Sequence, residues 1–496
     1  MEYLSQNIID HKHVNGSSTR IVQSLNPAHP QQVVSSFHES SAEDVHAAAL
    51  SAKKAFKAWS LWPAQERAKI LYKTAELLMK YKEDLATLET REMGKTIEET
   101  RGDVQEAIDC ALLYAGEGRR WFGQTIPSEL PDKFCMTVRR PVGVCGLITA
   151  WNFPIAVPSW KIIPALICGN TLVFKPAEDA PHSGQRLVEI LIEAGLPKGV
   201  LNLVQGTGEI TGEALLHCEH IDLISFTGST QTGSHVAEVC GKTLKRVALE
   251  MGGKNASIIM PDANLELALD GILWGAFATS GQRCTATSRL IIHKSIKDDF
   301  LKKLIAQTQQ LRIGDGLNAD IQVGPLVNAK QLERVKKYVE IGINEDRATL
   351  VLGGPNDIQR VPKEGFFYPP TIFDKVTPQM RLAREEIFGP VLSVLTFESF
   401  DEALEIMNNT PYGLSSSIYT QDVDRVFKAI RDIDAGITYI NGPTIGAEVH
   451  LPFGGVKNSG NGHREAGSQV LDIFSEWKTV YVDYSGKLQR AQMDNN

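Results

Sequence analysis

The stretch that decides the fold runs from residue 142 to residue 174 and reads VGVCGLITAWNFPIAVPSWKIIPALICGNTLVF. It opens and closes on short apolar runs, Val142–Ile148 and Thr171–Phe174, whose near-continuous hydrophobicity is typical of strands buried on both faces. Asparagines, prolines and a lysine interrupt the residues between them. The stretch therefore lacks the roughly 20 uninterrupted apolar residues that a membrane span needs.

The same alternation continues on the carboxyl side of this stretch. Further apolar runs at Val200–Val204, Ile221–Phe226 and Arg246–Leu249 are separated by helical patterns at Gly184–Ala194 and Gly233–Cys240. Strands that are apolar on both faces and alternate with helices are typical of a parallel, doubly wound sheet.

A second series of strands and helices follows Gly253, and helical patterns in Ser41–Leu88 precede the first series and are expected to cover its sheet. The second series comprises candidate strands Ser257–Met260, Leu290–His293, Leu350–Leu352, Val391–Phe397, Ser415–Tyr419 and Ile437–Ile440, with helices such as Asp299–Leu311 and Asp422–Asp432. We therefore predict an α/β fold with two doubly wound parallel-sheet domains.

Two isolated strand-like segments, Phe134–Arg139 and Trp477–Tyr484, lie far apart in the sequence. If they pair in a projecting flap, they present an apolar edge that is costly to leave in water, which favours subunit association. The alternative is a hairpin packed on its own domain.

Composition and charge narrow the function. The chain has 496 residues, of which 43% are hydrophobic and 22% charged, enough for two or three domains with substantial cores. The net charge of -8 and the pI of about 5.9 indicate no basic face for nucleic acid or acidic membranes, so small-molecule partners are favoured. Met1–His13 lacks the order of a signal peptide. Seven irregularly spaced cysteines form no disulfide framework or metal pattern, which indicates a reducing, cytoplasmic setting.

Cys284 has the surroundings of a reactive thiol. It lies in SGQRCTA (residues 280–286), a polar, glycine-marked break after a long helical pattern, whereas the other cysteines lie in more apolar surroundings. A free cysteine is more often a small buried hydrophobe than a nucleophile, and that alternative stays open.

Two further residues supply what a thiol needs for covalent chemistry on a carbonyl. Glu250, in LEMGGK (residues 249–254), is a candidate base, although alone it is better explained by a helix cap or a salt bridge. Asn152, in TAWNFP (residues 149–154), places an amide donor after an apolar strand, where it can receive oxyanion charge. Glu250 and Cys284 fall on either side of a domain boundary, where catalytic clefts commonly lie.

A nucleotide site is indicated by loops that follow the predicted strands. FTGSTQTG (residues 226–233) opens a helix whose N–H groups can meet a pyrophosphate, and Gly206-Thr207-Gly208 follows another strand. Neither matches the G-x-G-x-x-G fingerprint, and tight turns are the alternative. KPAE (residues 175–178) lies on the nucleotide-binding edge of such a sheet, or is a surface charge pair.

At this point the chain resembles the NAD(P)-dependent aldehyde dehydrogenase superfamily, from about Ser41 to Tyr484. The resemblance rests on seven motifs in order: WNFP (151–154), KPAE (175–178), FTGST (226–230), LEMGGK (249–254), GQRC (281–284), EEIFGP (385–390) and PFGG (452–455).

The resemblance implies roles for individual residues. Cys284 would be the nucleophile and Glu250 the base, with an oxyanion hole from the Asn152 amide and the Cys284 backbone N–H. It implies NAD as the cofactor, with tolerance for NADP, because the Glu178 carboxylate would repel a 2'-phosphate while Lys175 would accept one. No metal is implied. The implied cofactor-binding residues are Ile148, Thr149, Trp151, Lys175, Glu178, Gly208, Phe226, Gly228, Ser229, Met251, Gly252, Glu386 and Phe388.

By the same resemblance we expect an NAD-binding domain in residues 1–123 and 142–252, a catalytic domain in 253–456, and an oligomerisation flap with a C-terminal tail in 124–141 and 472–496. A homodimer or a homotetramer is expected.

The substrate is expected to be an aldehyde, oxidised to a carboxylic acid through a cysteine thiohemiacetal and a thioester. Asn152, Arg283 and Phe453 are the candidate substrate-binding residues, and Arg283 weakly favours a semialdehyde that carries a carboxylate; a structural ion pair is its alternative. Competing functions are a dehydrogenase that passes the thioester to coenzyme A, a cysteine esterase or hydrolase, and a non-enzymatic binding protein.

Overall fold

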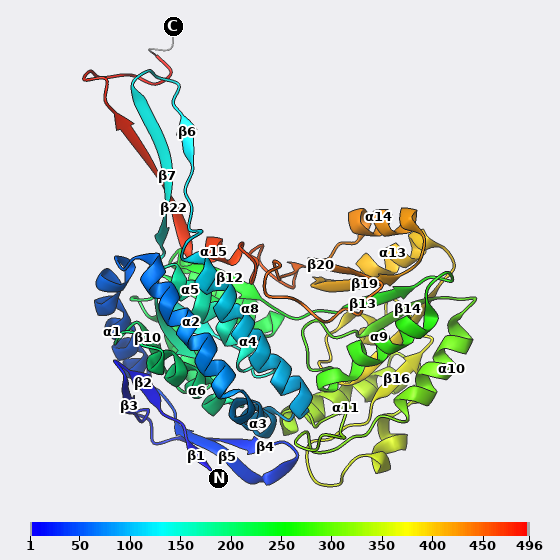
Figure 1. The fold of residues 1–496 in the computed structure, drawn as a ribbon. Helices are drawn as coiled ribbons and strands as arrows, with labels where there is room; N and C mark the ends of the chain where they lie inside the picture. Colours follow the sequence, from blue (N-terminus) through cyan, green and yellow to red (C-terminus); the bar gives the residue numbers. More distant parts are fainter. Residues whose placement is uncertain (1, 494–496) are drawn as a thin grey trace.

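The computed structural model describes residues 2–493, and two seven-stranded sheets organise the molecule (Figure 1). The strands of the first sheet, in spatial order, are β12 (Arg246–Glu250), β11 (Leu223–Thr227), β8 (Val144–Ile148), β9 (Thr171–Lys175), β10 (Leu201–Leu203), β2 (Asn7–Ile9) and β3 (Lys12–Val14). The run from β12 to β10 is parallel, as predicted. The chain winds outward from β8 in both directions, which places a topological switch point between β8 and β11.

Two antiparallel strands that were not predicted from the sequence extend one edge of this parallel sheet. Strands β2 and β3 are antiparallel to β10 and to each other. They are three residues each and come from a polar amino-terminal segment; β3 pairs with the adjacent β2, and β2 joins the sheet through β10, which is far away in the sequence.

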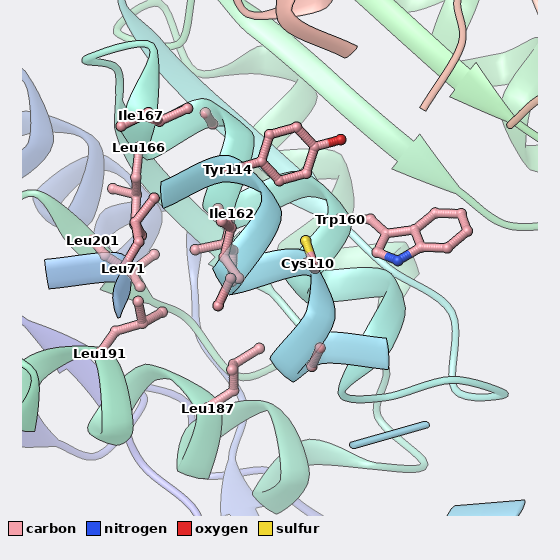
Figure 2. Close-up of a cluster of buried hydrophobic side chains, with 14 of the residues drawn as sticks. Leu71, Cys110, Tyr114, Trp160, Ile162, Leu166, Ile167, Leu187, Leu191 and Leu201 are labelled. Carbon is pink, nitrogen blue, oxygen red and sulfur yellow. The ribbon is translucent and has the colours of Figure 1, made fainter. Parts of the chain in front are cut away.

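Helices cover both faces of the first sheet, which explains the continuous hydrophobicity of its strands. On β8, Cys145 and Leu147 belong to one apolar cluster while Val144 and Ile148 belong to another. Figure 2 shows part of the first cluster, where Leu71, Ile162 and Leu187 lie among the packed side chains. The helices are α1 (Ala42–Ser60), α2 (Ala64–Lys80), α3 (Lys82–Met93), α4 (Ile97–Glu117), α5 (Ala156–Ile167), α6 (Pro181–Glu193), α7 (Glu213–His217) and α8 (Thr230–Lys242).

The second sheet has the order β15 (Thr349–Leu352), β16 (Thr371–Asp374), β17 (Val391–Phe397), β14 (Arg289–His293), β13 (Ala256–Ile259), β19 (Ser415–Tyr419) and β20 (Ile437–Ile440). All neighbouring strands are parallel except β15 and β16, which are antiparallel. Strand β16 was not predicted from the sequence. Its helices are α9 (Leu265–Phe277), α10 (Lys297–Thr308), α11 (Ala329–Asn344), α12 (Arg381–Arg384), α13 (Phe400–Asn408) and α14 (Val423–Asp432). The chain passes from one sheet to the other between Glu250 and Ala256, while the domain boundary at residue 252 stays a prediction.

The two isolated strand-like segments pair, as expected, in a flap that projects from the molecule (Figure 1). Strands β7 (Lys133–Pro141) and β22 (Ser475–Asp483) are antiparallel, and β6 (Thr125–Pro127) adds a third strand. Phe134, Trp477 and Tyr481 are exposed on it, so the flap is not the hairpin packed on its own domain that was the alternative.

Smaller elements complete the fold. They are β1 (Tyr3–Leu4), β4 (Ile21–Asn26) and β5 (His29–His38) in a three-stranded sheet, β18 (Tyr412–Gly413) paired with β21 (Val456–Lys457), and α15 (Val470–Ile473). Across residues 2–493, no helix has the length and apolar character needed to span a membrane.

Candidate active site

A cavity of about 300 Å³ lies where the two sheets meet, and it brings together the three predicted catalytic residues. Asn152 follows β8, Glu250 ends β12, and Cys284 lies in the loop after α9. The loops after β8, β11 and β12 all line the cavity, so it opens at the carboxyl ends of the strands beside the switch point.

Cys284 is carried by a loop with an unusual backbone. Helix α9 ends at Phe277, and Thr279, Ser280 and Gly281 then take left-handed φ values of 52°, 55° and 69°. Cys284 is partly exposed, whereas the other six cysteines are buried. Asn255 Nδ2 donates 2.7 Å to the Cys284 carbonyl and fixes the loop from the second sheet's side.

The thiol of Cys284 is protonated at neutral pH in this cavity. Burial raises its pKa to about 12, and the carboxylates of Glu250 and Glu386 add to the rise. Arg283 and the backbone of Thr285 act in the opposite direction with smaller effect. Formation of the thiolate therefore requires a base or an added positive charge in the cavity.

Glu250 is a buried carboxyl group with neither of the structural roles that were its alternatives. It is only 4% exposed, and within residues 2–493 neither of its carboxylate oxygens has a hydrogen-bond partner. Burial, and then the charge of Glu465, raise its pKa well above the usual range, while Lys161 and Arg464 act against the rise. A carboxyl without a structural bond beside a thiol is available for proton transfer.

Asn152 points its amide toward the nucleophile loop. Its side chain is buried, and Nδ2 donates 3.1 Å to the Gln282 carbonyl, two residues before Cys284. The amide therefore lies beside the loop that carries the nucleophile, where an oxyanion donor is needed.

One wall of the cavity has the donors and spaces that a dinucleotide needs. Ser229 begins α8, with its hydroxyl accepting 3.2 Å from Thr232 N. Gly253 N donates 3.0 Å to Glu386, whose carboxylate lies so close to Gly252 that a Cβ there would meet it at 2.2 Å. The rings of Trp151 and Phe388 meet edge to face at 5.5 Å. Seven predicted cofactor residues line the cavity: Trp151, Gly228, Ser229, Met251, Gly252, Glu386 and Phe388.

The other six predicted cofactor residues are not among those that line the cavity, namely Ile148, Thr149, Lys175, Glu178, Gly208 and Phe226. Ile148 and Phe226 are buried in the apolar core of the first sheet. Lys175 Nζ is buried, donates 2.8 Å to the Gly206 carbonyl, and lies 3.7 Å from the half-exposed Glu178. Their cofactor roles stay predictions.

Four polar residues that sequence reasoning missed also line the cavity: Glu106, Gln331, Arg334 and Glu465. Glu465 pairs with Lys161, whose Nζ also donates 3.0 Å to Ser225 Oγ. A lysine inside the apolar pattern of α5 is a signal for this arrangement, because a buried ammonium requires a charged partner. Gln331 Nε2 donates 2.6 Å to the Phe388 carbonyl and holds the EEIFGP loop.

Both further candidate substrate residues lie on the cavity wall. The Phe453 ring packs edge to face on Trp160 at 5.1 Å. Arg283 lies 5.2 Å from the Phe153 ring centre, and its Nη2 is 3.5 Å from Glu99. The ion pair that was the alternative for Arg283 is therefore present, on a side chain that also borders the cavity.

This fold and this cavity define an enzyme class: a doubly wound nucleotide-binding protein with a thiol, a carboxyl and an amide arranged for covalent chemistry. The chain matches the sequence model of the Aldehyde dehydrogenase family over residues 13–480 and belongs to that family. The resemblance seen in the sequence is thereby confirmed, and the protein is an enzyme that oxidises aldehydes.

Similar proteins extend over nearly the whole chain. It is 40% identical over 476 residues to the alpha-ketoglutaric semialdehyde dehydrogenase of Bacillus subtilis (strain 168), covering 96% of this chain and 97% of that protein. It is 39% identical over 480 residues to the betaine aldehyde dehydrogenase of the same organism, covering 95% and 96%. The solved NAD-dependent aldehyde dehydrogenase from Sinorhizobium meliloti superposes with a TM-score of 0.95 at 38% identity, covering 99% of this chain and 96% of that one.

Proposed function

We propose that this protein oxidises an aldehyde to a carboxylic acid with NAD, through a covalent intermediate on Cys284. The observation that carries the proposal is the meeting of Cys284, Glu250 and Asn152 in one cavity whose other wall suits a dinucleotide. The NAD named for similar enzymes supports the choice of cofactor.

The residues of the cavity fit that cofactor. The N-terminus of α8 with Ser229 would receive the pyrophosphate, Glu386 a ribose, and Phe388 would lie beside the nicotinamide. Glu178 favours NAD over NADP, and Lys175 leaves room for both. When bound, NAD supplies the hydride acceptor.

The chain's own residues account for the remaining steps. Ionised Glu250 takes the thiol proton of Cys284 and passes it to solvent. The resulting thiolate attacks the aldehyde carbon, and the carbonyl oxygen becomes an alkoxide held by the Asn152 amide and the Cys284 N–H. Loss of hydride from that carbon leaves a thioester. Glu250 takes a proton from water, the hydroxide adds to the thioester, and the carbon–sulfur bond breaks to release the acid and the thiol.

The raised pKa values of Cys284 and Glu250 set the order of events. Burial raises the pKa of both groups, so the positive nicotinamide ring would favour the thiolate and the ionised carboxyl. Cofactor binding before attack follows from this charge balance.

A semialdehyde that carries a carboxylate is the substrate class we favour. Arg283 on the cavity wall supplies the cation, and semialdehyde dehydrogenases among similar proteins support the choice. One observation favours a second class, an aldehyde with an ammonium group: Glu106 lines the same cavity, and a betaine aldehyde dehydrogenase is also similar.

The competing functions differ in what they need. A coenzyme A-acylating enzyme has no need of the water-activating Glu250, and a cysteine hydrolase has no need of a dinucleotide wall.

We also propose a cytoplasmic setting, which the unpaired thiol supports, and a homodimer or homotetramer joined through the exposed flap. Light scattering on the protein with and without the Trp477→Ser change tests the assembly.

The deciding experiment follows absorbance at 340 nm with NAD, without coenzyme A, over a panel of succinic semialdehyde, betaine aldehyde and hexanal. We expect oxidation with the parent enzyme and none with Cys284→Ala, which should still bind NAD. Oxidation by the alanine variant would reject the mechanism. A kcat/KM for succinic semialdehyde no higher than that for hexanal would reject the carboxylate preference, and a preference for betaine aldehyde would establish the second class.

A further inference from the structure

The backbone conformation of the loop that carries Cys284 requires stabilising contacts from other segments. Thr279 and Ser280 are not glycines, yet both take left-handed backbone angles, followed by left-handed Gly281. Side chains with a Cβ avoid that region, so such a run persists only where surrounding contacts determine it. The contacts must come from outside the loop.

Glu99, in the first turn of α4, provides that hold from across the domain boundary. Its Oε1 accepts 2.6 Å from Thr279 N and 3.0 Å from Thr279 Oγ1, and lies 3.5 Å from Arg283 Nη2. Its Oε2 accepts 3.1 Å from Thr96 N and 3.0 Å from Thr96 Oγ1, which anchors the carboxylate to the start of its own helix. Both oxygens are therefore committed, and the side chain is only 12% exposed.

The same face of α4 holds the segment that carries Asn152. Asp103 stands one turn after Glu99 and is buried; its Oδ1 accepts 2.6 Å from Ala156 N, where α5 begins. Its Oδ2 accepts 2.6 Å from Lys95 Nζ, which lies 3.8 Å from the centre of the Phe153 ring. Phe153 is the neighbour of Asn152, so Asp103 and Lys95 fix the amide's position in the chain.

We propose that Glu99 and Asp103 are positioning residues that set the distance between Asn152 and Cys284. Helix α4 contacts both the loop before Cys284 and the segment after Asn152. It therefore fixes the two donors of the oxyanion hole, the Asn152 amide and the Cys284 N–H, relative to each other. The inference rests on the proposed roles of Asn152 and Cys284, and neither positioning residue contacts the reacting atoms.

Glu99→Ala tests the inference, and Glu98→Ala is its matched control. Glu98 is in the same helical turn, carries the same charge, is 72% exposed and pairs with Arg101. We expect Glu99→Ala to lower kcat by about a hundredfold, because a displacement of about 1 Å in a catalytic group has that effect, and Glu98→Ala to stay within about twofold. NAD affinity, measured by fluorescence titration, should be unchanged in both.

A second readout separates positioning from a general loss of structure. Alkylation of Cys284 by iodoacetamide, followed by mass spectrometry of the peptide, needs the thiol but no oxyanion hole. For Glu99→Ala we expect an alkylation rate within about threefold of the parent while oxidation falls about a hundredfold. An equal fall in both rates would overturn the inference.

The double-mutant cycle with Asn152→Ala gives the decisive comparison. If Glu99 acts by placing the oxyanion hole, its removal costs little once Asn152 is gone, so Glu99→Ala/Asn152→Ala should match Asn152→Ala alone. The inference would be overturned if the losses in kcat of the two single variants multiply in the double variant, or if Glu99→Ala has a normal kcat. Should Glu99→Ala fail to fold, Glu99→Gln, which keeps the volume and one acceptor oxygen, takes its place. Oxidation surviving in Cys284→Ala or Asn152→Ala would instead reject the proposed function.

Discussion

Two loops meet in the cavity, and they reach it by different means. In the loop of residues 251–255, glycines provide space: a Cβ on Gly252 would meet Glu386 at 2.2 Å, and one on Gly253 would meet the Cys284 carbonyl at 2.8 Å. Neither glycine has a left-handed φ. In the loop of residues 278–284, Thr279 and Ser280 take left-handed angles at a cost of about 1–2 kcal/mol each.

The residues that determine the shape of each loop lie in different parts of the sequence. The first loop is encoded locally, by two adjacent glycines that any reader of the sequence notices. The second is encoded elsewhere, because Glu99 and Gly324 hold Thr279 and Ser280 through hydrogen bonds that span many residues. Substitutions in the two loops should therefore fail for different reasons.

Asn152→Ala should have the largest effect, because Asn152 contacts the second loop and receives the alkoxide. We expect kcat to fall by about a hundredfold or more, the effect of removing one oxyanion-hole donor. Steady-state kinetics at saturating NAD measures it. Turnover near that of the parent would remove Asn152 from the mechanism.

Gly252→Ala should perturb the loop of residues 251–255 through steric overlap alone. Alanine is allowed at this backbone conformation, but its methyl group displaces the Glu386 carboxylate. We expect KM for NAD to rise about tenfold, equivalent to about 1.4 kcal/mol of binding, with a smaller change in kcat. Gly241→Ala is the control, since a Cβ on Gly241 meets no atom within 4 Å. An unchanged KM would show that Glu386 moves aside freely.

The same contrast explains how much was predictable from the sequence. The parallel strands of the first sheet were found because burial on both faces makes them apolar throughout. Because the carboxyl ends of parallel strands lie at the same edge of a sheet, the loops that follow these strands were expected to lie together. Strands β2, β3 and β16 were missed because they are short, and β2 in addition has a distant partner in β10. Glu465 was missed because its partner Lys161 lies 304 residues away: the apolar pattern around Lys161 indicates that a charged partner exists but does not identify it.

Glu465→Gln should change the pH dependence rather than abolish activity. The charge of Glu465 helps to raise the pKa of Glu250, so its removal, with Lys161 and Arg464 left in place, lowers that pKa. Glu250 acts as a base in its ionised form, which appears as pH rises through its pKa. The rising limb of kcat against pH should therefore move to lower pH.

The control for that measurement is Glu398→Gln, an exposed carboxylate that pairs with Lys294 and does not line the cavity. Its profile should overlay that of the parent. A rising limb of Glu465→Gln that stays in place, or moves to higher pH, would contradict the assignment of Glu250 as the titrating base.

Ser280→Gly should have the smallest effect. Glycine adopts the left-handed angle of Ser280 without strain, which offsets the loss of the 2.6 Å bond from Ser280 Oγ to the Gly324 carbonyl. A neutral hydrogen bond contributes about 1 kcal/mol, so urea unfolding should change by no more than about that amount, and kcat by no more than about threefold. A loss as large as that of Asn152→Ala would mean that the serine hydroxyl, and not Glu99 on α4, determines the shape of the nucleophile loop.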